Sequence, residues 1–340
     1  MASAIGSERG RALGAQADFF VCDIFDAAPK DDMASMEHPI FSLGTRPDRR
    51  ILNYAHNGVT LQVTPSVKGR ATIHDKDILI YCISQLMAAL NAGRAISRTL
   101  HLKAHDLLTA TNRDTSGDSY TRLREAFERL AGTRITTNMT NGGLETTRGF
   151  GLIESWEIVR KPGGKSGGGR MISVIVTLSD WLLQAVLSKS VLTLNRDYFS
   201  LRKPLERRVY ELARKHCGRQ PEWRVSVKTL HKKSGSVAPL RVFRAAMRKM
   251  IAQTDLPDYD MIEEPGDLIR FGRRDLVVDT TGVAALDADT LEAARALVPG
   301  QDVYALEAEW RSWWIRTGRK PLRAPGRAFL GWVKTRKPSL

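Results

Sequence analysis

The chain has 340 residues, of which 42% are hydrophobic and 26% charged, a composition typical of a soluble protein with two or three compact domains. No apolar run is long enough to cross a membrane and no signal peptide is visible, so we expect neither a membrane protein nor a secreted one. Three scattered cysteines without a CxxC pair exclude a disulfide framework and favour the reducing cytoplasm.

Positive charge is the strongest signal in the composition. The net charge is +15 and the isoelectric point is about 10.0. The charge is segregated along the chain: residues 1–45 are net −4, 193–253 net +12, 254–309 net −10 and 310–340 net +9. Such an organised basic surface indicates a polyanionic partner. Nucleic acid fits better than a membrane, because arginine dominates and the basic segments alternate with strands instead of forming one amphipathic helix.

The first half of the chain predicts an arm, a hairpin and a helix-rich unit. Residues 1–45 mix small, acidic and aromatic residues with prolines and predict a mostly irregular acidic arm with one or two short helical turns. Asn57-Gly58, between alternating apolar residues, predicts a β-hairpin over 51–64. Apolar residues three and four apart then predict a helix at 75–92. We expect the following elements after it: a strand at 99–102, helices at 103–109 and 119–131, strands at 134–140 and 144–160, and a strand at 171–178 after a glycine-rich stretch.

The second half repeats this order of elements. We expect helices at 203–217, 228–233 and 239–253, strands at 223–227, 259–271 and 274–279, and closing helices at 289–297, 303–317 and 324–334. Three helices followed by a β-hairpin are typical of a winged helix, a helix-turn-helix with a β wing. We therefore predict an α+β fold with tandem winged-helix domains and a small C-terminal helical segment, divided into an irregular acidic arm (1–45), a first winged-helix domain (46–190), a second (191–285) and a basic helical segment (286–340).

The helix predicted at 239–253 is the best candidate for reading DNA. Its apolar positions form one stripe, and Arg241, Arg244 and Arg248 lie on another face with Lys249 nearby. An arginine face suits the major groove, where arginine pairs with guanine. The alternative is a solvated basic face. We favour the groove because no acidic residue interrupts this helix, so no salt bridge can form within it.

The other candidate DNA contacts are less distinctive. The third helix of the first unit offers a possible groove-facing set, for which ordinary pairing of arginine with glutamate is an equal alternative: Ser119, Tyr120, Thr121, Arg122, Arg124 and Arg129. Contacts to the phosphate backbone are expected from a glycine-rich wing tip and from the second helix of the second unit: Lys161, Lys165, Arg170, Lys228, Lys232 and Lys233. Each of these residues taken singly is more often just a solvated charge.

The sequence contains partial matches to catalytic and metal-binding motifs, and none of them is complete. Gly164-Lys165-Ser166 lacks the glycine and the helix of a nucleotide-binding loop, and His101 and His105 lack the glutamate and third ligand of a metal site. No His-x-His pair of a rolling-circle nickase occurs, and Glu263, Glu264 and Asp267 read as an acidic loop. The tryptophans at 310, 313, 314 and 332 have the spacing of a helical core more than that of a base-stacking surface. We expect no catalytic residue, metal or cofactor.

Three stretches carry a resemblance to a known family. VLTLNRDYFSLRKPLERRVYELARKHCG (191–218), MEHPIFSLGTRPDRRILNYAHNG (36–58) and AEWRSWWIRTGRKPLRAPGRAFLGWVK (308–334) resemble the plasmid replication initiator protein A family. The family often has histidine where this chain has Asn195. The resemblance implies a protein with tandem winged helices that binds repeats at a plasmid origin, opens the duplex, recruits the host initiator and replicative helicase, and frequently represses its own promoter. We expect double-stranded DNA as its partner and no enzymatic activity, and the choice between monomer and dimer stays open. The alternative is a dedicated winged-helix transcriptional repressor without a replication role.

Overall fold

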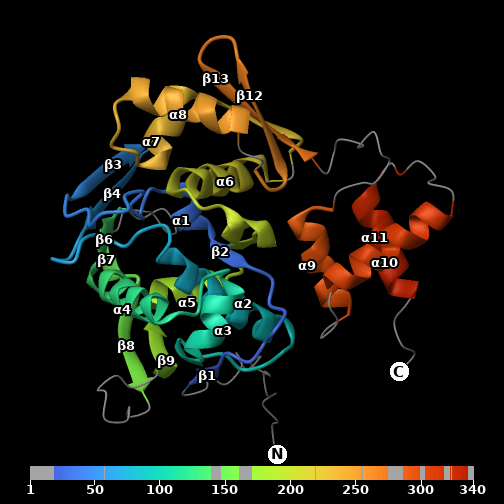
Figure 1. Cartoon of the computed structure of the whole chain (residues 1–340), viewed down its shortest axis with the longest axis horizontal. Helices are drawn as coiled ribbons and strands as arrows, with labels where there is room; N and C mark the ends of the chain where they lie inside the picture. Colours follow the sequence, from blue (N-terminus) through green and yellow to red (C-terminus); the bar gives the residue numbers. More distant parts are fainter. Residues whose placement is uncertain are drawn as a thin grey trace, which may run out of the picture.

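One order of helices and strands occurs twice in the computed structural model (Figure 1). The structure describes residues 19–56, 58–138, 147–160, 171–218, 220–253, 256–274, 286–298, 303–317, 322 and 324–335. Buried apolar residues gather in three hydrophobic cores: one spans the first unit and the N-terminal segment, one fills the second unit, and one lies within the C-terminal helices. The α+β class predicted from the sequence is confirmed.

The first unit is built around a long buried helix. Its elements are α2 (Lys76–Asn91), β5 (Thr99–Leu102), α3 (Ala104–Ala110), α4 (Gly117–Gly132), β8 (Ile153–Arg160) and β9 (Met171–Leu178). Strand β9 pairs antiparallel with both β5 and β8, so the last strand lies in the middle of the sheet. β1 (Phe20–Val21) adds to the free edge of β5 in parallel, and α5 (Asp180–Leu187), which the sequence reading missed, follows β9.

A second, four-stranded sheet accompanies the first unit. β3 (Leu52–His56) and β4 (Val59–Thr64) form the hairpin predicted from Asn57-Gly58; Gly58 has a φ of +79°, and Asn57 lies outside the described residues. β4 pairs with β6 (Arg134–Thr137), which pairs with β7 (Arg148–Gly151). Tyr54, Leu61 and Ile135 point from this sheet into the first core. The predicted strand at 144–160 is therefore two strands in two different sheets.

The second unit repeats the order of the first. It consists of α6 (Pro204–Cys217), β11 (Glu222–Ser226), α7 (Val227–Ser234), α8 (Leu240–Gln253), β12 (Tyr259–Glu264) and β13 (Leu268–Arg273). β13 lies between β11 and β12, as β9 lies between β5 and β8. The sequence reading placed one strand over 259–271. The structure shows a hairpin there, because Asp267 (φ +60°) and Gly266 (φ +85°) turn the chain; residues 275–279 lie outside the described part.

The described part of the N-terminal segment contains the short helical turn predicted from the sequence, α1 (Met33–Glu37), and adds two short strands to it. Strand β2 (Lys30–Asp32) pairs antiparallel with β10 (Val191–Thr193), and α1 packs against α6. β10 leads into the 3-10 helix η1 (Arg196–Ser200). Asp32 caps α1 by accepting a hydrogen bond from the backbone amide of Ser35. The segment thus ties the first unit to the second.

Buried charges join the two units. Lys76 of α2 is completely buried, and its Nζ lies 2.6 Å from Oδ2 of Asp31 and 3.0 Å from Oε1 of Glu211 on α6. Burial alone would lower the pKa of Lys76, but these carboxylates outweigh it and raise the pKa. Arg207, also on α6, donates to Asp77 of α2 at 2.5 Å. A buried network of this kind fixes how α2 and α6 lie against each other.

The C-terminal segment forms three short helices, as predicted: α9 (Ala288–Leu297), α10 (Val303–Arg316) and α11 (Pro325–Thr335). Trp310 is buried against Phe329, so it packs inside this segment. Ion pairs connect α9 to the rest of the molecule: Arg214 lies 2.7 Å from Asp289, and Lys30 lies 3.3 Å from Glu292. Among the described residues, no helix combines the length and apolarity that a membrane span requires.

Candidate nucleic-acid interface

Helix α8 divides into a buried and an exposed face. Phe243, Met247 and Met250 are buried in the second core. Arg241, Arg248 and Lys249 lie on the exposed side. In the turn before α8, Gly235 ends α7 in the left-handed conformation (φ +70°), and His231 Nε2 lies 2.8 Å from the carbonyl oxygen of Ala238. The sequence's apolar stripe is therefore confirmed, and α8 presents its arginines from a fixed position.

Two of the α8 arginines are held by the β12–β13 hairpin. Arg244 makes two hydrogen bonds to Asp267 (2.7 and 2.8 Å), and Arg248 binds Glu263 at 2.8–3.1 Å. These hydrogen bonds lower the pKa of both carboxyl groups, which stay charged. Of the three acidic residues predicted to form a loop, Glu263 and Asp267 lie on the hairpin and bind α8, whereas Glu264 pairs with Arg224 and Arg270. Helix α8 itself contains no acidic residue, but carboxylates of the neighbouring hairpin pair with Arg244 and Arg248.

Four basic residues of the second unit stay exposed and have no hydrogen bond or ion pair to another described residue: Arg241, Lys249, Lys228 and Lys232. Lys233, predicted at a DNA phosphate, is only 6% exposed and is paired with Glu37. Burial by itself would raise the pKa of Glu37, but hydrogen bonds from His216 and Lys233 hold it well below its usual value. Lys233 therefore anchors α7 to the N-terminal segment and is not part of the interface.

Only some of the residues predicted to contact DNA from helix α4 are exposed. Ser119 is buried, and Arg129 makes two hydrogen bonds to Asp75 (2.7 and 2.8 Å) at the start of α2, so both serve the fold. Tyr120 is half-buried against the first core, and Arg124 pairs with Glu128 at 3.3 Å. Thr121 and Arg122 are exposed. Lys161, Lys165 and Arg170 lie outside the described residues, between the ends of β8 and β9.

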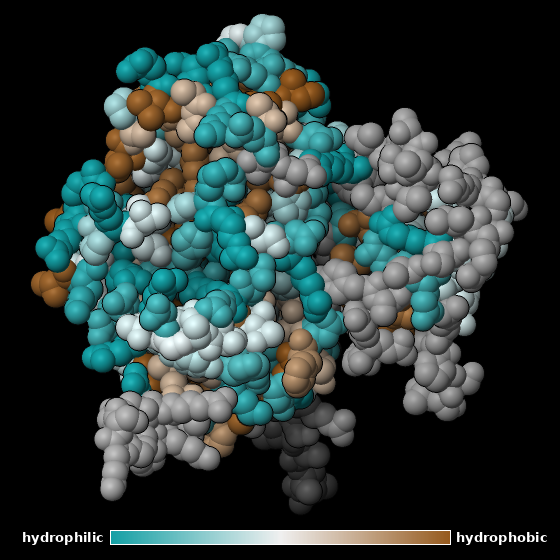
Figure 2. Space-filling model, viewed as in Figure 1, coloured by the Kyte–Doolittle hydropathy of each residue, from teal (hydrophilic) through white to brown (hydrophobic). Residues whose placement is uncertain are grey.

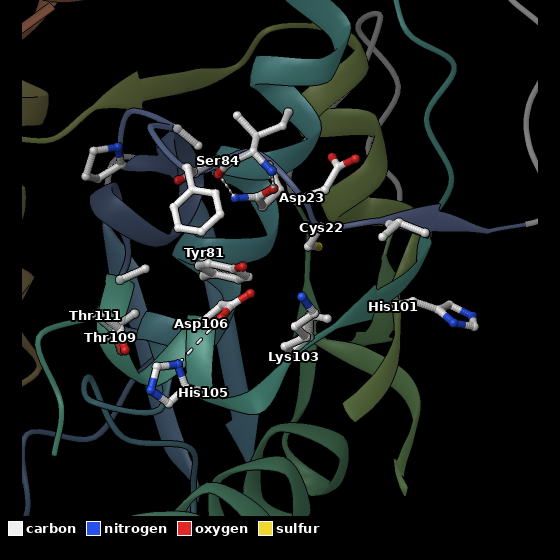
Figure 3. A pocket seen from close by; sticks show the side chains of 18 of the residues that line it. Cys22, Asp23, Tyr81, Ser84, His101, Lys103, His105, Asp106, Thr109 and Thr111 are labelled. Atoms are coloured by element: carbon white, nitrogen blue, oxygen red, sulfur yellow. Dashed lines mark hydrogen bonds and ion pairs between the residues drawn. The ribbon is translucent and has the colours of Figure 1, made fainter. Parts of the chain in front are cut away.

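A cavity of about 490 Å³ lies between residues 21–29 and helices α2 and α3 (Figure 3). Burial, with smaller contributions from Cys82 and Asp23, raises the pKa of the Cys22 thiol in its wall, which makes it a poor nucleophile. Gln85 is committed to both backbone groups of Ile24, at 3.0 and 2.7 Å. His105 and Asp106 lie 3.6 Å apart at the wall. The side chains that line this cavity do not bring a nucleophile against a base.

Metal ligands do not gather in the described residues either: no group of three or more His, Cys, Asp or Glu side chains there could hold a metal ion. The three cysteines are all buried. Burial raises the pKa of Cys82 to about 12.

Comparisons with known proteins identify the class. The chain is 39% identical over 261 residues to a curated protein of Wigglesworthia glossinidia brevipalpis named "Putative replication protein", covering 76% of this chain and 94% of that protein. A crystal structure of domains 2 and 3 of RctB superimposes with a TM-score of 0.50 at 14% identity, covering 70% of this chain and 94% of that one. A second RctB crystal structure gives a TM-score of 0.47. The RctB domains share the fold.

The family model of replication initiator protein A matches residues 30–261, from β2 into β12. The match covers more than half of the chain and includes the first unit and the second unit as far as the start of β12. The chain belongs to the replication initiator protein A family, as the resemblance of its motifs predicted, and its role lies in the initiation of DNA replication.

Proposed function

We propose that this chain starts plasmid replication by binding double-stranded DNA repeats at the origin, through two winged helices. In both units, a helix and a strand precede two helices and a hairpin, and the last strand lies centrally in the sheet. This is the order of a helix-turn-helix with a β wing. Helices α4 and α8 are then the recognition helices, and β8–β9 and β12–β13 are the wings.

The observation that carries this proposal is the exposed face of α8. Arg241, Arg248 and Lys249 project from a helix whose opposite face is packed in a core, and Lys228 and Lys232 flank it on α7. A rigid helix with an arginine face matches the donor and acceptor pattern of guanine in the major groove. The α7 lysines suit the phosphates on either side of that groove.

The remaining steps rest on family membership. We propose that the bound protein opens the duplex and recruits the host initiator and replicative helicase. It also represses its own promoter and controls plasmid copy number. All of this takes place in the cytoplasm, without catalytic chemistry of the protein's own. Self-association at the repeats belongs to the same proposal.

The test is the triple change Arg241→Ala, Arg244→Ala, Arg248→Ala in a band-shift assay with origin DNA. Loss of one base contact costs about 1–3 kcal/mol, so affinity should fall at least tenfold. Arg94→Ala, which removes an exposed arginine paired with Asp23 far from α8, is the control and should bind normally. Unchanged affinity of the triple variant would refute groove reading by α8. A plasmid carrying the origin and this gene separates an initiator, which replicates it in a naive host, from a repressor, which only silences the promoter.

A further inference from the structure

The β3–β4–β6–β7 sheet has one exposed face that neither the family nor the sequence motifs assign. Its inner face packs on the first core. Six side chains are exposed on the other side, at positions that the strand register places on a common face, and we call this the outer face: Asn53, Ala55, Thr60, Gln62, Arg134 and Thr136. Gln62 donates to Asn53 at 3.0 Å. A hollow of about 440 Å³ lies against this sheet, lined by uncharged residues.

The outer face is flat because β7, its last strand, has glycines at the positions that would otherwise carry side chains on this face. Gly149 and Gly151 stand opposite Thr136 and Arg134 in the register of β6 and β7. A Cβ atom at Gly151 would lie 3.4 Å from Nη1 of Arg134, so the guanidinium extends over this glycine. The sheet therefore presents amide, hydroxyl and guanidinium groups with no bulky side chain beside them.

Positive charge predominates around the outer face. The four strands contain no acidic residue. At one end of the sheet, Arg46, Arg49, Arg50 and Lys68 are all exposed. The nearby Asp48 is bound by Arg50 (2.8 Å) and by Arg70 (3.2 Å), so its charge is compensated. A polyanion is the partner that such a surface attracts.

The sheet also lies between the helices that the proposed function assigns to DNA. Lys68, just past β4, pairs with Glu128 of α4 at 3.5 Å, and a Cβ on Gly132 of α4 would meet Ser66. At the other end, β3 lies beside α7 (Figure 1). His56, the last residue of β3, is close enough to Lys233 and Lys232 for their charges, after burial, to lower its pKa. The sheet thus connects the neighbourhoods of α4 and α7.

We propose that the outer face binds the sugar–phosphate backbone of the duplex between the contacts of the two units. This rests on the proposed function. Amide and hydroxyl side chains and arginine are the groups that contact phosphate and sugar without reading sequence. A second copy of the chain fits less well as the partner. The centre of a stable protein interface is rich in large apolar side chains, and the outer face has none. Hydrophilic residues cover most of the molecular face in Figure 2, and apolar ones are scattered over it.

The direct test is affinity cleavage. The native cysteines are all buried, so a DNA-cleaving iron chelate attached to Thr136→Cys labels one place. Gln184→Cys, at an exposed position of α5, is the matched control. The proposal predicts strand cleavage inside the bound origin repeat from the Thr136 label and none from the control. A Thr136 label that fails to cleave DNA, while the labelled protein still shifts the origin fragment, would overturn it.

Binding strength gives the second readout. The variant Asn53→Ala, Gln62→Ala, Arg134→Ala should weaken origin binding by about threefold or more and make the salt dependence shallower by about one ion per lost arginine contact. The control Asn91→Ala, Gln184→Ala, Arg94→Ala removes the same residue types elsewhere and should behave as the unmodified protein. Unchanged binding, or dissociation of a dimer without loss of DNA affinity, would overturn the proposal. If unmodified protein fails to bind the origin, the proposed function is wrong; if only the α8 variant loses binding, the sheet inference alone is wrong.

Discussion

Replacing Lys76 by methionine tests the buried charges that join the two units. The change removes the cation that lies 2.6 Å from Asp31 and 3.0 Å from Glu211, where all three side chains are at most 1% exposed. Two buried carboxyl groups then lose the cation that they share. Removing one partner of a buried ion pair costs about 3–5 kcal/mol, a large share of the 5–15 kcal/mol that stabilises a typical domain.

Urea denaturation followed by circular dichroism measures this loss. Lys68→Met is the control, because this lysine is 63% exposed and its 3.5 Å pair with Glu128 should contribute less than about 1 kcal/mol. Adding Asp31→Asn to Lys76→Met should recover much of the loss, since Glu211 keeps Arg208 at 3.1 Å and the Tyr198 hydroxyl at 2.8 Å. A cost below about 1 kcal/mol for Lys76→Met, or a double variant less stable than the single one, would refute the reasoning.

Two further predictions concern pH and the second wing. Burial lowers the pKa of His38 and of His74 to about 4 from 6.5, so both are neutral in the folded protein. The unfolded chain takes up their protons first as the pH falls, and stability should decrease from about pH 6.5 down to about pH 4, by roughly 3 kcal/mol per histidine. Urea midpoints of His38→Gln and His74→Gln should show a flatter decrease; an unchanged pH profile would contradict this. Glu263→Gln with Asp267→Asn should release Arg248 and Arg244 and tighten binding to non-specific duplex severalfold at low salt, as measured by fluorescence anisotropy. Weaker binding would instead mean that the carboxylates position the arginines for DNA.

The local patterns of the sequence sufficed for most helices. The apolar spacing of α8, the proline at the first turn of α6 and the glycine after α7 are signals within a few residues, and all three helices appear where expected. The α2 helix, almost entirely buried, was also found from its spacing. The hairpin β3–β4 followed from Asn57-Gly58, because this turn chemistry is itself local.

Long-range pairing accounts for what the sequence did not reveal. β2 joins β10, about 160 residues further along the chain, and neither strand is longer than three residues, so nothing in its own pattern predicts it. The same is true of side-chain partners: Lys233 meets Glu37 across 196 positions, and Arg129 meets Asp75 across 54. A basic residue on a helix has the same local signal whether it faces DNA or a distant carboxylate. Only the fold shows that Arg241 is exposed whereas Lys233 is paired with Glu37.

The measurement that tests the central claim most directly is a hydroxyl-radical footprint of the purified protein on the parent plasmid. The account predicts protection of repeated sites at the replication origin, lost when Arg241, Arg244 and Arg248 are replaced by alanine and kept with Arg94→Ala. Protection that is independent of sequence, or that survives the triple change, would contradict it.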